Sequence, residues 1–245
     1  MKTPVRVLLL GAKGRMGQAI AAAAEKSGAS IVAGLDLGDK ISNHIAGCDV
    51  VIDFSHSNGT SELCRACTQA TKPAVIGTTG HSKEERAAIE KLALSVPVVL
   101  SPNFSVGVNA LFWLTRKAAK MLGDGFDLEI TEMHHRLKKD APSGTAKKLA
   151  EILCDVRGLD YSKNVSHGRE GLVGERRVNE IGMHSIRGGD VVGDHTVTFA
   201  GAGERLELSH KAASRETFAG GALRAAGWIV GKPAGLYSME DVLGL

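Results

Sequence analysis

The sequence predicts an α/β fold: a doubly wound parallel (Rossmann) dinucleotide-binding domain plus a second, α+β domain with a mixed sheet. Three observations predict it. A glycine-rich loop follows the first apolar run, short apolar runs alternate with helical patterns as far as residue 104, and consecutive strand patterns without helices between them occupy residues 181–210. At 245 residues the chain is long enough for two small domains. We expect residues 1–104 and 215–245 to form the first and residues 105–214 the second.

The first β-α-β segment carries the features of a dinucleotide site. An apolar strand at residues 5–10 leads directly into Gly11, Gly14 and Gly17, and residues 18–26 have a helical pattern. The next strand, residues 30–35, ends in Asp36, which lies 19 positions after Gly17 (36 − 17), close to the ~20 of dinucleotide-binding folds. Such glycines permit a tight turn and close approach of a pyrophosphate. The alternative is a plain β-α-β unit without a ligand.

Asp36 also bears on the choice of nucleotide. Its carboxylate suits the ribose hydroxyls of NADH and would repel a 2′-phosphate. Leu37 follows it, where an NADPH-selective enzyme more usually carries Arg. Lys13, Arg15 and Lys40 could compensate. We therefore expect NADH as the preferred cofactor, with NADPH tolerated.

The alternation of strands and helices continues up to residue 104. We expect strands at 50–55, 73–76 and 96–100, and helices at 60–69 and 83–94. Parallel strands place their carboxyl ends on one edge, where ligands of such sheets bind. Loops of small and polar residues follow these strands at Asp53–Ser55, Gly77–Gly80 and Ser101–Phe104. Taken singly each is ordinary turn chemistry, but together they favour a cofactor cleft.

The second half has a different pattern. We expect helices at 108–121 and 146–154, and strands at 127–133, 181–187, 196–200 and 205–210. Strands joined by glycine-rich turns without helices indicate a mixed or antiparallel sheet. A further apolar helix at 217–230 is expected to return to the first domain. Residues 156–180 carry no recognisable motif, and no role is assigned to them.

The run Glu132–Ala146 is rich in chemically active groups. It contains His134 and His135, then Arg136, Lys138 and Lys139, and finally the helix start Ser143-Gly144-Thr145. Imidazole exchanges protons near neutral pH, and the first backbone N–H groups of a helix can bind an anion. Adjacent strand residues point to opposite faces, so both histidines can serve one site only if the strand ends or bends there. The alternative is a polar loop leading into a capped helix.

Composition excludes several classes of protein. Hydrophobic residues make up 43% and charged residues 23%, and a net charge of +3 with interleaved acids does not predict a nucleic-acid partner. No stretch approaches the ~20 apolar residues of a membrane span, and no hydrophobic leader precedes the first strand, so we expect a cytoplasmic protein without a membrane partner. The four cysteines, including Cys64 and Cys67 in a helical pattern, are expected to be reduced thiols. No metal is expected, because adjacent histidines cannot readily bind one ion.

Several motifs together resemble the dihydrodipicolinate reductase family, and the resemblance extends over nearly the whole chain. They are Gly11–Gly17, Gly77–Gly80, Ser101–Asn109, Glu132–Ala146, Gly189–Thr196 and Gly203–Ala212. The string His-His-x-x-Lys-x-Asp-Ala-Pro-Ser-Gly-Thr is highly specific. The resemblance implies NAD(P)H-dependent reduction of a cyclic dicarboxylate, 4-hydroxy-tetrahydrodipicolinate, in lysine and diaminopimelate biosynthesis, by a homotetramer.

The resemblance also implies roles for individual residues. His134 and Lys138 would be the acid/base residue and the proton donor. The substrate would be held by His135, Ser143, Gly144, Thr145 and Thr79. The cofactor would be held by Gly11, Ala12, Lys13, Gly14, Arg15, Met16, Asp36, Gly77, Thr78, Thr79, Ser101, Pro102, Asn103 and Phe104. From the residues alone two alternatives stay open: another two-domain dehydrogenase, and a dinucleotide sensor without catalytic activity.

Overall fold

The computed structural model describes residues 3–245, which form two units with separate hydrophobic cores. Unit 1 runs as far as Val106 and includes Arg215–Leu245, and unit 2 is Gly107–Ser214. Within residues 3–245, every helix is too short or too polar to cross a membrane.

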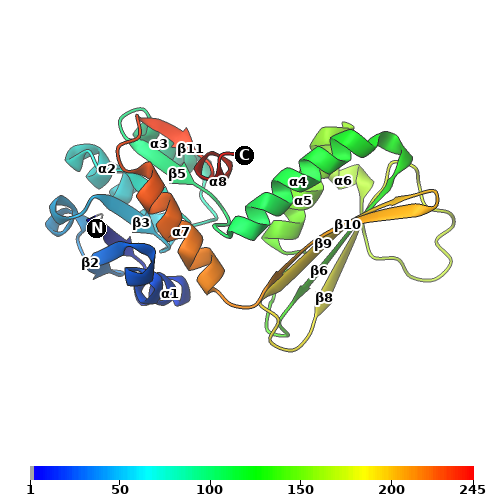
Figure 1. Ribbon diagram of the computed structural model, residues 1–245, viewed down its shortest axis with the longest axis horizontal. Coiled ribbons are helices and arrows are strands. Elements are labelled where there is room, and N and C mark those ends of the chain that lie inside the picture. Colours follow the sequence, from blue (N-terminus) through cyan, green and yellow to red (C-terminus); the bar gives the residue numbers. More distant parts are fainter. Residues whose placement is uncertain (1–2) are drawn as a thin grey trace. The chain divides into compact units, whose positions relative to one another are not determined.

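Unit 1 is built on a parallel six-stranded sheet (Figure 1). Its strand order is β11-β5-β4-β3-β1-β2. All of its strand pairs are parallel, which confirms the Rossmann-like prediction. The strands are β1 (Val5–Leu10), β2 (Ala29–Leu35), β3 (Val50–Asp53), β4 (Ala74–Ile76), β5 (Pro97–Leu100) and β11 (Gly235–Tyr237). The three-residue β11 was not expected, because so short a segment carries no periodic signal.

Helices cover both faces of this sheet because successive strand residues point in opposite directions. Val7 and Leu9 of β1 face a core that includes α7, whereas Leu8 and Leu10 face a core formed with α2 and α3. The bounds are α1 (Arg15–Ala23), α2 (Thr60–Ala70), α3 (Lys83–Ala93), α7 (Glu216–Ile229) and α8 (Met239–Leu243). Short 3₁₀ turns occur at Glu25–Ser27, Ile41–Asn43, Ile45–Gly47 and Ser57–Gly59.

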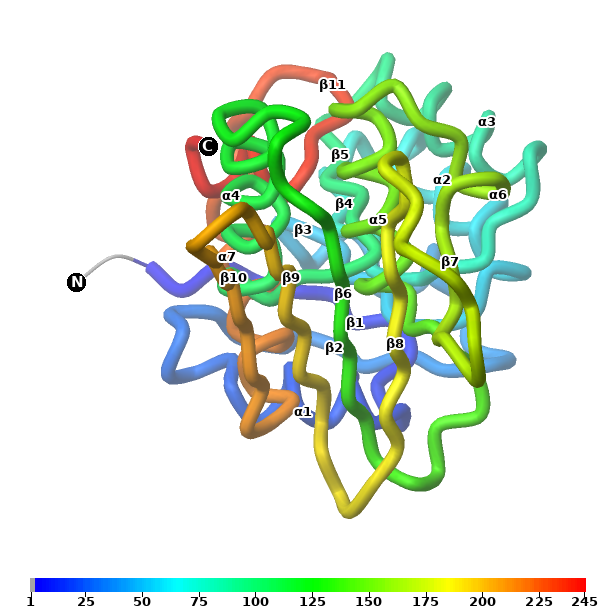
Figure 2. Tube along the Cα trace, turned by 90° about the vertical axis from the view of Figure 1, so that its right-hand side faces the viewer, coloured from blue at the N-terminus to red at the C-terminus, as the bar shows by residue number. Residues whose placement is uncertain are grey.

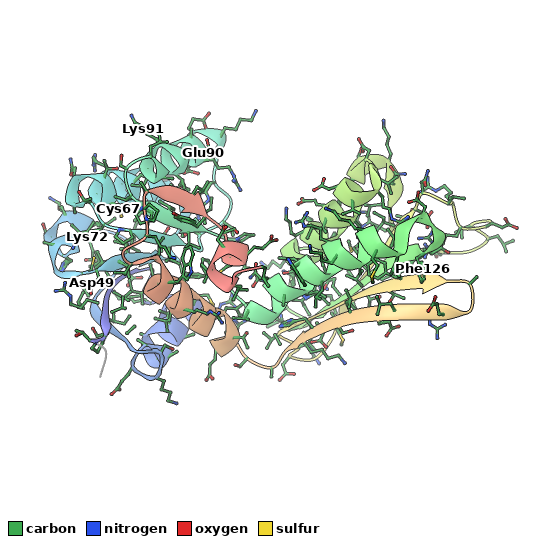
Figure 3. The ribbon with its side chains drawn as sticks, turned by 45° about the horizontal axis from the view of Figure 1, so that its top comes forward. Asp49, Cys67, Lys72, Glu90, Lys91 and Phe126 are labelled. Carbon is green, nitrogen blue, oxygen red and sulfur yellow. The ribbon has the colours of Figure 1, made fainter. Side chains whose placement is uncertain are left out.

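A group of polar contacts lies at the amino ends of these strands, away from the edge where ligands are expected. Asp49 precedes β3 and pairs with Arg6, 2.6 Å between side-chain atoms. The ammonium of Lys72, just before β4, donates to the carbonyl of Cys48 over 2.6 Å. Figure 3 labels Asp49 and Lys72 together with Cys67 of α2. Because burial raises the pKa of the Cys64 thiol to about 11 and also raises that of Cys67, this pair is in the unreactive thiol form at neutral pH.

Unit 2 contains a five-stranded mixed sheet with the order β10-β9-β6-β8-β7 (Figure 2). β9 is antiparallel to both β6 and β10, but β8 runs parallel to β6 and to β7. The strands are β6 (Asp127–His134), β7 (Val165–His167), β8 (Ile181–Arg187), β9 (Gly193–Gly201) and β10 (Glu204–Ala212). The mixed sheet agrees with the prediction, although the sequence did not indicate which pairs are parallel.

Two long helices pack on one face of this sheet (Figure 1). α4 (Val106–Leu122) and α5 (Gly144–Arg157) contribute apolar side chains to a core shared with β6, β8 and β9. A 3₁₀ turn at Gly123–Gly125 ends α4, and a short helix α6 (Tyr161–Asn164) follows α5. Phe126, labelled in Figure 3, precedes β6 and occupies the space that a side chain at Gly201 would need.

The segment to which the sequence assigned no role is fixed to this sheet by ion pairs. Arg169 bridges Glu129 of β6 and Glu180, and Arg176 also contacts Glu129, at 3.1 Å. Arg177 pairs with Glu180 at 3.1 Å. These ion pairs fix the loop to the sheet. Its apolar side chains Leu172 and Val178 remain exposed to solvent.

Candidate active site

The glycine loop after β1 has the close packing that a nucleotide-binding turn needs. Gly11 has φ +79°, a conformation that L side chains rarely adopt. A Cβ at Gly17 would overlap the carbonyl oxygen of Gly11, so α1 begins directly against the loop. α1 starts at Arg15 rather than at the expected residue 18, because the turn is completed within four residues.

Asp36 closes the other side of the same loop. Its carboxylate accepts the backbone N–H of Lys13 at 3.1 and 3.2 Å, and its own N–H donates to Asp39 over 2.9 Å. A cavity of about 490 Å³ opens here, between the ends of β1, β2 and β3. Its lining includes the carboxylates of Asp36, Asp39 and Glu62, and none of the lining residues, all of them within residues 3–245, is Lys or Arg.

The loops after β3 and β4 are tied to each other by a buried carboxylate. Asp53 is 2% exposed and accepts the hydroxyl of Thr78 at 2.9 Å and the backbone N–H of Ser55 at 3.0 Å. Gly77 lies against the ring of Phe54, which occupies the space of any Cβ there. The Thr78 hydroxyl is therefore used within the protein, whereas Thr79 is exposed at the carboxyl end of β4.

The loop after β5 is braced in the same way. Ser101 donates its hydroxyl to the carbonyl of Asn103 over 2.7 Å, and the Asn103 side chain accepts the N–H of Ser105 at 2.8 Å. Phe104 is 1% exposed, with its ring 5.5 Å from that of Phe54. From this loop a ligand can reach Pro102 and backbone groups, but not the Phe104 ring. The predicted cofactor residues thus lie in loops at one edge of the sheet, and several of their side chains are engaged inside the protein. Of these residues, Gly11 and Asp36 line the cavity.

In unit 2, β6 ends at His134, so His135 lies outside the regular strand. This removes the difficulty of two adjacent histidines pointing to opposite faces. The ring Nδ1 of His135 is buried and has no hydrogen-bond partner among residues 3–245. Residues two apart in a strand share a face, and accordingly Glu132 and His134 are in contact, with Oε2 2.6 Å from Nδ1.

Glu132 is a fully buried carboxylate that accepts several hydrogen bonds from the protein. Arg187 of β8 donates from Nη1 to Oε2 and from Nη2 to Oε1, both over 2.8 Å. The backbone N–H of Ser143 donates to Oε1 over 3.2 Å. Burial alone would raise its pKa, but hydrogen bonds from Arg187 and His134 reverse this and lower the pKa of Glu132 to about 2. It is therefore a carboxylate at neutral pH.

His195 of β9 lies next to His134. The rings meet edge to face with centroids 5.2 Å apart, and the His195 Nε2 is 2.9 Å from the hydroxyl of Ser143. Burial lowers the pKa of His195 to about 3, assisted by the charge of His134, so this ring is neutral. Burial also lowers the pKa of His134, opposed by Glu132 and assisted by Lys138 and Arg187.

The start of α5 completes this site. Ser143 is its N-cap and accepts the N–H of Ala146 at 3.2 Å, while Gly144 is exposed. Ser143 is only 3% exposed, and its hydroxyl forms hydrogen bonds with His195 and with the first turn of the helix. The ammonium of Lys138 contacts both oxygens of Asp140, at 2.9 and 3.0 Å. The site therefore combines a buried carboxylate, the adjoining imidazoles of His134 and His195, an ammonium and the first amides of a helix, an arrangement suited to binding an anion and moving a proton.

Sequence reasoning assigned no role to Glu132, Arg187 or His195. The strand register brings them together: His134 lies opposite Arg187, and Glu132 opposite His195. The two-residue spacing of Glu132 and His134 could have indicated that these two side chains are in contact. The described residues contain no group of three or more His, Cys, Asp or Glu side chains arranged to hold a metal ion.

Comparison with known proteins identifies the family. The model of the dihydrodipicolinate reductase N-terminus matches residues 5–104, and that of its C-terminus matches residues 107–243. A 4-hydroxy-tetrahydrodipicolinate reductase of Akkermansia muciniphila is 57% identical over 98% of both chains. One of Geobacter metallireducens is 45% identical over 98% of this chain and 99% of its own.

A solved structure agrees with these sequence matches. It is the dipicolinate-bound dihydrodipicolinate reductase of Paenisporosarcina sp., with a TM-score of 0.78 and 26% identity, covering 97% of this chain and 98% of that one. With both family models matched in order along nearly the full length, the chain belongs to the dihydrodipicolinate reductase family.

Proposed function

We propose that this protein reduces 4-hydroxy-tetrahydrodipicolinate to tetrahydrodipicolinate with a reduced pyridine nucleotide, in the route to diaminopimelate and lysine. The observation that carries the proposal is the contact of His134 with a buried Glu132 beside the start of α5, in a chain that also has a nucleotide-type glycine loop. A relative that is 57% identical bears the name of this reductase.

The substrate has two carboxylates, and unit 2 has groups for them. The N–H groups of Gly144 and Thr145 begin a 14-residue helix, and because the start of a helix attracts anions, they suit one carboxylate. His135 and Ser143, which both precede this helix in sequence, are assigned to the same substrate contact. Thr79, exposed at the end of β4, is the contact assigned to unit 1.

His134 and Lys138 are the groups assigned to proton transfer. Once the C4 hydroxyl has left as water, the ring is a conjugated imine. A reduced nicotinamide bound to unit 1 would supply a hydride to ring C4, and the negative charge that develops toward C3 is then neutralised by a proton. Lys138 carries an ammonium 20% exposed and held by Asp140, and it is the proton donor in this proposal. His134, with its ring partly buried, acts as the acid/base partner.

The residues of unit 1 fit a dinucleotide. The glycine loop leaves no room for side chains at Gly11 and Gly17, and this allows a pyrophosphate to approach the backbone and the start of α1. The 490 Å³ cavity beside Asp36 suits an adenosine ribose. Contacts to the nucleotide are assigned to Gly11–Met16, Asp36, Gly77–Thr79 and Ser101–Phe104.

The cavity supports NADH as the preferred nucleotide, with NADPH as a second substrate. A 2′-phosphate placed near the ribose would meet the carboxylates of Asp36 and Asp39 without a lining cation. Lys13 and Arg15 are exposed nearby in the loop and support some use of NADPH. Cytoplasmic location and a homotetramer remain part of the proposal, supported by the family resemblance.

The decisive assay supplies the unstable substrate from the preceding condensing enzyme and follows the loss of reduced nicotinamide absorbance. We expect NADH oxidation only when both the condensing enzyme and its substrates are present. Substituting His134 or Lys138 should abolish most turnover with nearly unchanged NADH affinity. NADH binding without any oxidation would instead identify a nucleotide sensor.

A further inference from the structure

Glu132 has no assigned role, yet it is the most enclosed charged group of unit 2 with a side chain exposed by 0%. A buried carboxylate is costly unless every oxygen is paired. Here both oxygens are paired, and the partners come from three separate elements: β6, β8 and the start of α5. Each of these elements carries or adjoins a group of the proposed site.

We propose that Glu132, clamped by Arg187, is a positioning residue that fixes the tautomer of His134 and holds the start of α5 in register with it. The inference rests on the proposed function for its catalytic consequence. Its structural content, the state of one imidazole and the placement of one helix start, can be measured without turnover.

The first consequence concerns which nitrogen of His134 carries the proton. An ionised carboxylate only accepts hydrogen bonds, so the Nδ1 that lies 2.6 Å from Glu132 must donate. The neutral ring therefore keeps its proton on Nδ1 and leaves Nε2 as the base. The ring edge at Nε2 lies against Gly193, where a Cβ would come within 3.0 Å of that nitrogen. Glycine at this position leaves room for the ring in this orientation.

The second consequence concerns the anion-binding end of α5. The Oε1 atom accepts the N–H of Ser143, the N-cap of the helix. One rigid carboxylate thus sets both the imidazole and the amides of Gly144 and Thr145, which follow Ser143 directly. A displacement of Glu132 would move the proton-handling group and the anion grip relative to each other.

Arg187 makes the carboxylate rigid. Its guanidinium is a planar fork that contacts both oxygens of Glu132, and it also donates to the carbonyls of Ile186 and Asp140. Lysine could supply the charge but not this geometry. Arg187 is therefore the second positioning residue.

The charged and titratable groups around His134 determine the expected pH behaviour. They are Glu132 on its own strand, Arg187 on β8, His195 on β9 and Lys138 on the following loop. Of these, Glu132 raises the pKa of His134 and the cations lower it. Removing the charge of Glu132 should therefore shift the acidic limb of the kcat profile to lower pH.

The test uses Glu132→Gln in the full-length protein. The Gln side chain has the size of Glu and keeps one acceptor oxygen, but it carries no charge. Its NH₂ group can donate to His134, which the carboxylate cannot do. We expect kcat to fall about 100-fold, within the usual range for general acid–base catalysis, with the KM for the dicarboxylate changed about threefold or less. Nitrogen NMR of the ¹⁵N-histidine-labelled apoprotein should show His134 changing from the Nδ1–H to the Nε2–H tautomer.

Glu129→Gln is the matched control. Glu129 lies three positions earlier on the same strand and is also held by two arginines, Arg169 and Arg176, but it does not contact His134. This variant should be less stable than the wild type. Its kcat should stay within twofold of the wild-type value, and the tautomer of His134 should not change. Arg187→Lys is an independent variant in case Glu132→Gln folds poorly, and it should lower kcat about tenfold with the fold intact by circular dichroism.

The outcomes separate the two proposals. Wild-type kcat and an unchanged tautomer in Glu132→Gln, or an equal loss of kcat in Glu129→Gln, would overturn the positioning role. If wild-type protein failed to reduce the dicarboxylate, the proposed function would fail, and the tautomer measurement would still decide the role of Glu132.

Discussion

The backbone N–H of Ser143 donates to the buried carboxylate of Glu132 across eleven positions of the chain. The same carboxylate accepts Nδ1 of His134 at 2.6 Å. The start of a helix and a strand-end imidazole are therefore held by one side chain. In the proposed function, this relationship would let one short run of sequence supply both an anion site and a proton-transfer group.

The amides at the start of α5 can be tested by removing one N–H. Ser143 has an extended backbone (φ −64°, ψ 158°), which is compatible with a following proline, and proline is accepted at the first helical position. We predict that Gly144→Pro raises the KM for the dicarboxylate about tenfold or more, because a charge-assisted hydrogen bond contributes about 1.5–3 kcal/mol, and leaves the KM for NADH unchanged. Gly144→Ala keeps the N–H and should behave like the wild type. Equal KM values in the two variants would contradict carboxylate binding here.

The ammonium of Lys138 is predicted to matter for turnover rather than for nucleotide binding. Lys138→Met should lower kcat between about 100- and 10,000-fold, the usual range for a proton donor. Lys120→Met, at the end of α4 and exposed, is the matched control for losing a cation from unit 2. Steady-state kinetics with the coupled substrate supply give both values. A loss below threefold would remove Lys138 from the mechanism.

Nucleotide choice should respond to a single charge beside the adenosine cavity. Leu37 lines this cavity and is fully exposed. A cation at this position should attract a 2′-phosphate, and at about 1.4 kcal/mol per tenfold change we expect Leu37→Arg to raise the ratio of kcat/KM for NADPH over NADH about tenfold. Leu94→Arg adds the same charge at an exposed site outside the cavity and should not change the ratio. Wild-type protein that already strongly favours NADPH would refute the NADH preference.

Stability should fall in acid well before the carboxylates titrate. The pKa of His195 is about 3, below its usual 6.5, because the ring is buried. Between pH 6.5 and 3 the unfolded chain binds a proton that the native state does not, so the stability present above pH 6.5 is lost as pH falls. The slope from this residue is up to about 1.4 kcal/mol per pH unit.

Urea unfolding at pH 7 and pH 5 measures this effect. His195→Gln should show a smaller difference in unfolding free energy between the two pH values than the wild type. Some dependence should remain, because burial also lowers the pKa of His134 and of His210. Below pH 4.5 a further loss of stability is expected, because Glu132 and Glu129 then bind protons in the unfolded chain. In the native state each has a pKa of about 2 and stays ionised. An unchanged slope in His195→Gln would contradict a neutral buried ring.

The parts of the fold that sequence reasoning predicted are those with local signals. The strand, glycine loop and Asp36 follow each other within a short segment, and each feature has a local physical reason. The strand expected at residues 127–133 is also present, and β6 ends one residue later, at His134. The three-residue strands β7 and β11 were missed, because they are too short for periodicity to indicate them.

The parts that were missed depend on contacts distant in sequence. Glu132 and Arg187 are 55 positions apart, and Ser143 and His195 are 52 apart. Their meeting requires β8 to run parallel to β6 and β9 antiparallel to it, and strand composition does not encode direction. Ser101 and Thr78 were expected to contact the cofactor, and their loops lie where predicted. Their hydroxyls, however, form hydrogen bonds within the protein, to Asn103 and Asp53.

The central claim is that the dicarboxylate binds to unit 2 between the end of β6 and the start of α5. Crystals soaked with reduced nucleotide and dipicolinate test it most directly. We expect one carboxylate on the N–H groups of Gly144 and Thr145, with the ring beside His134 and Lys138. A diacid bound away from residues 134–145 would contradict the claim.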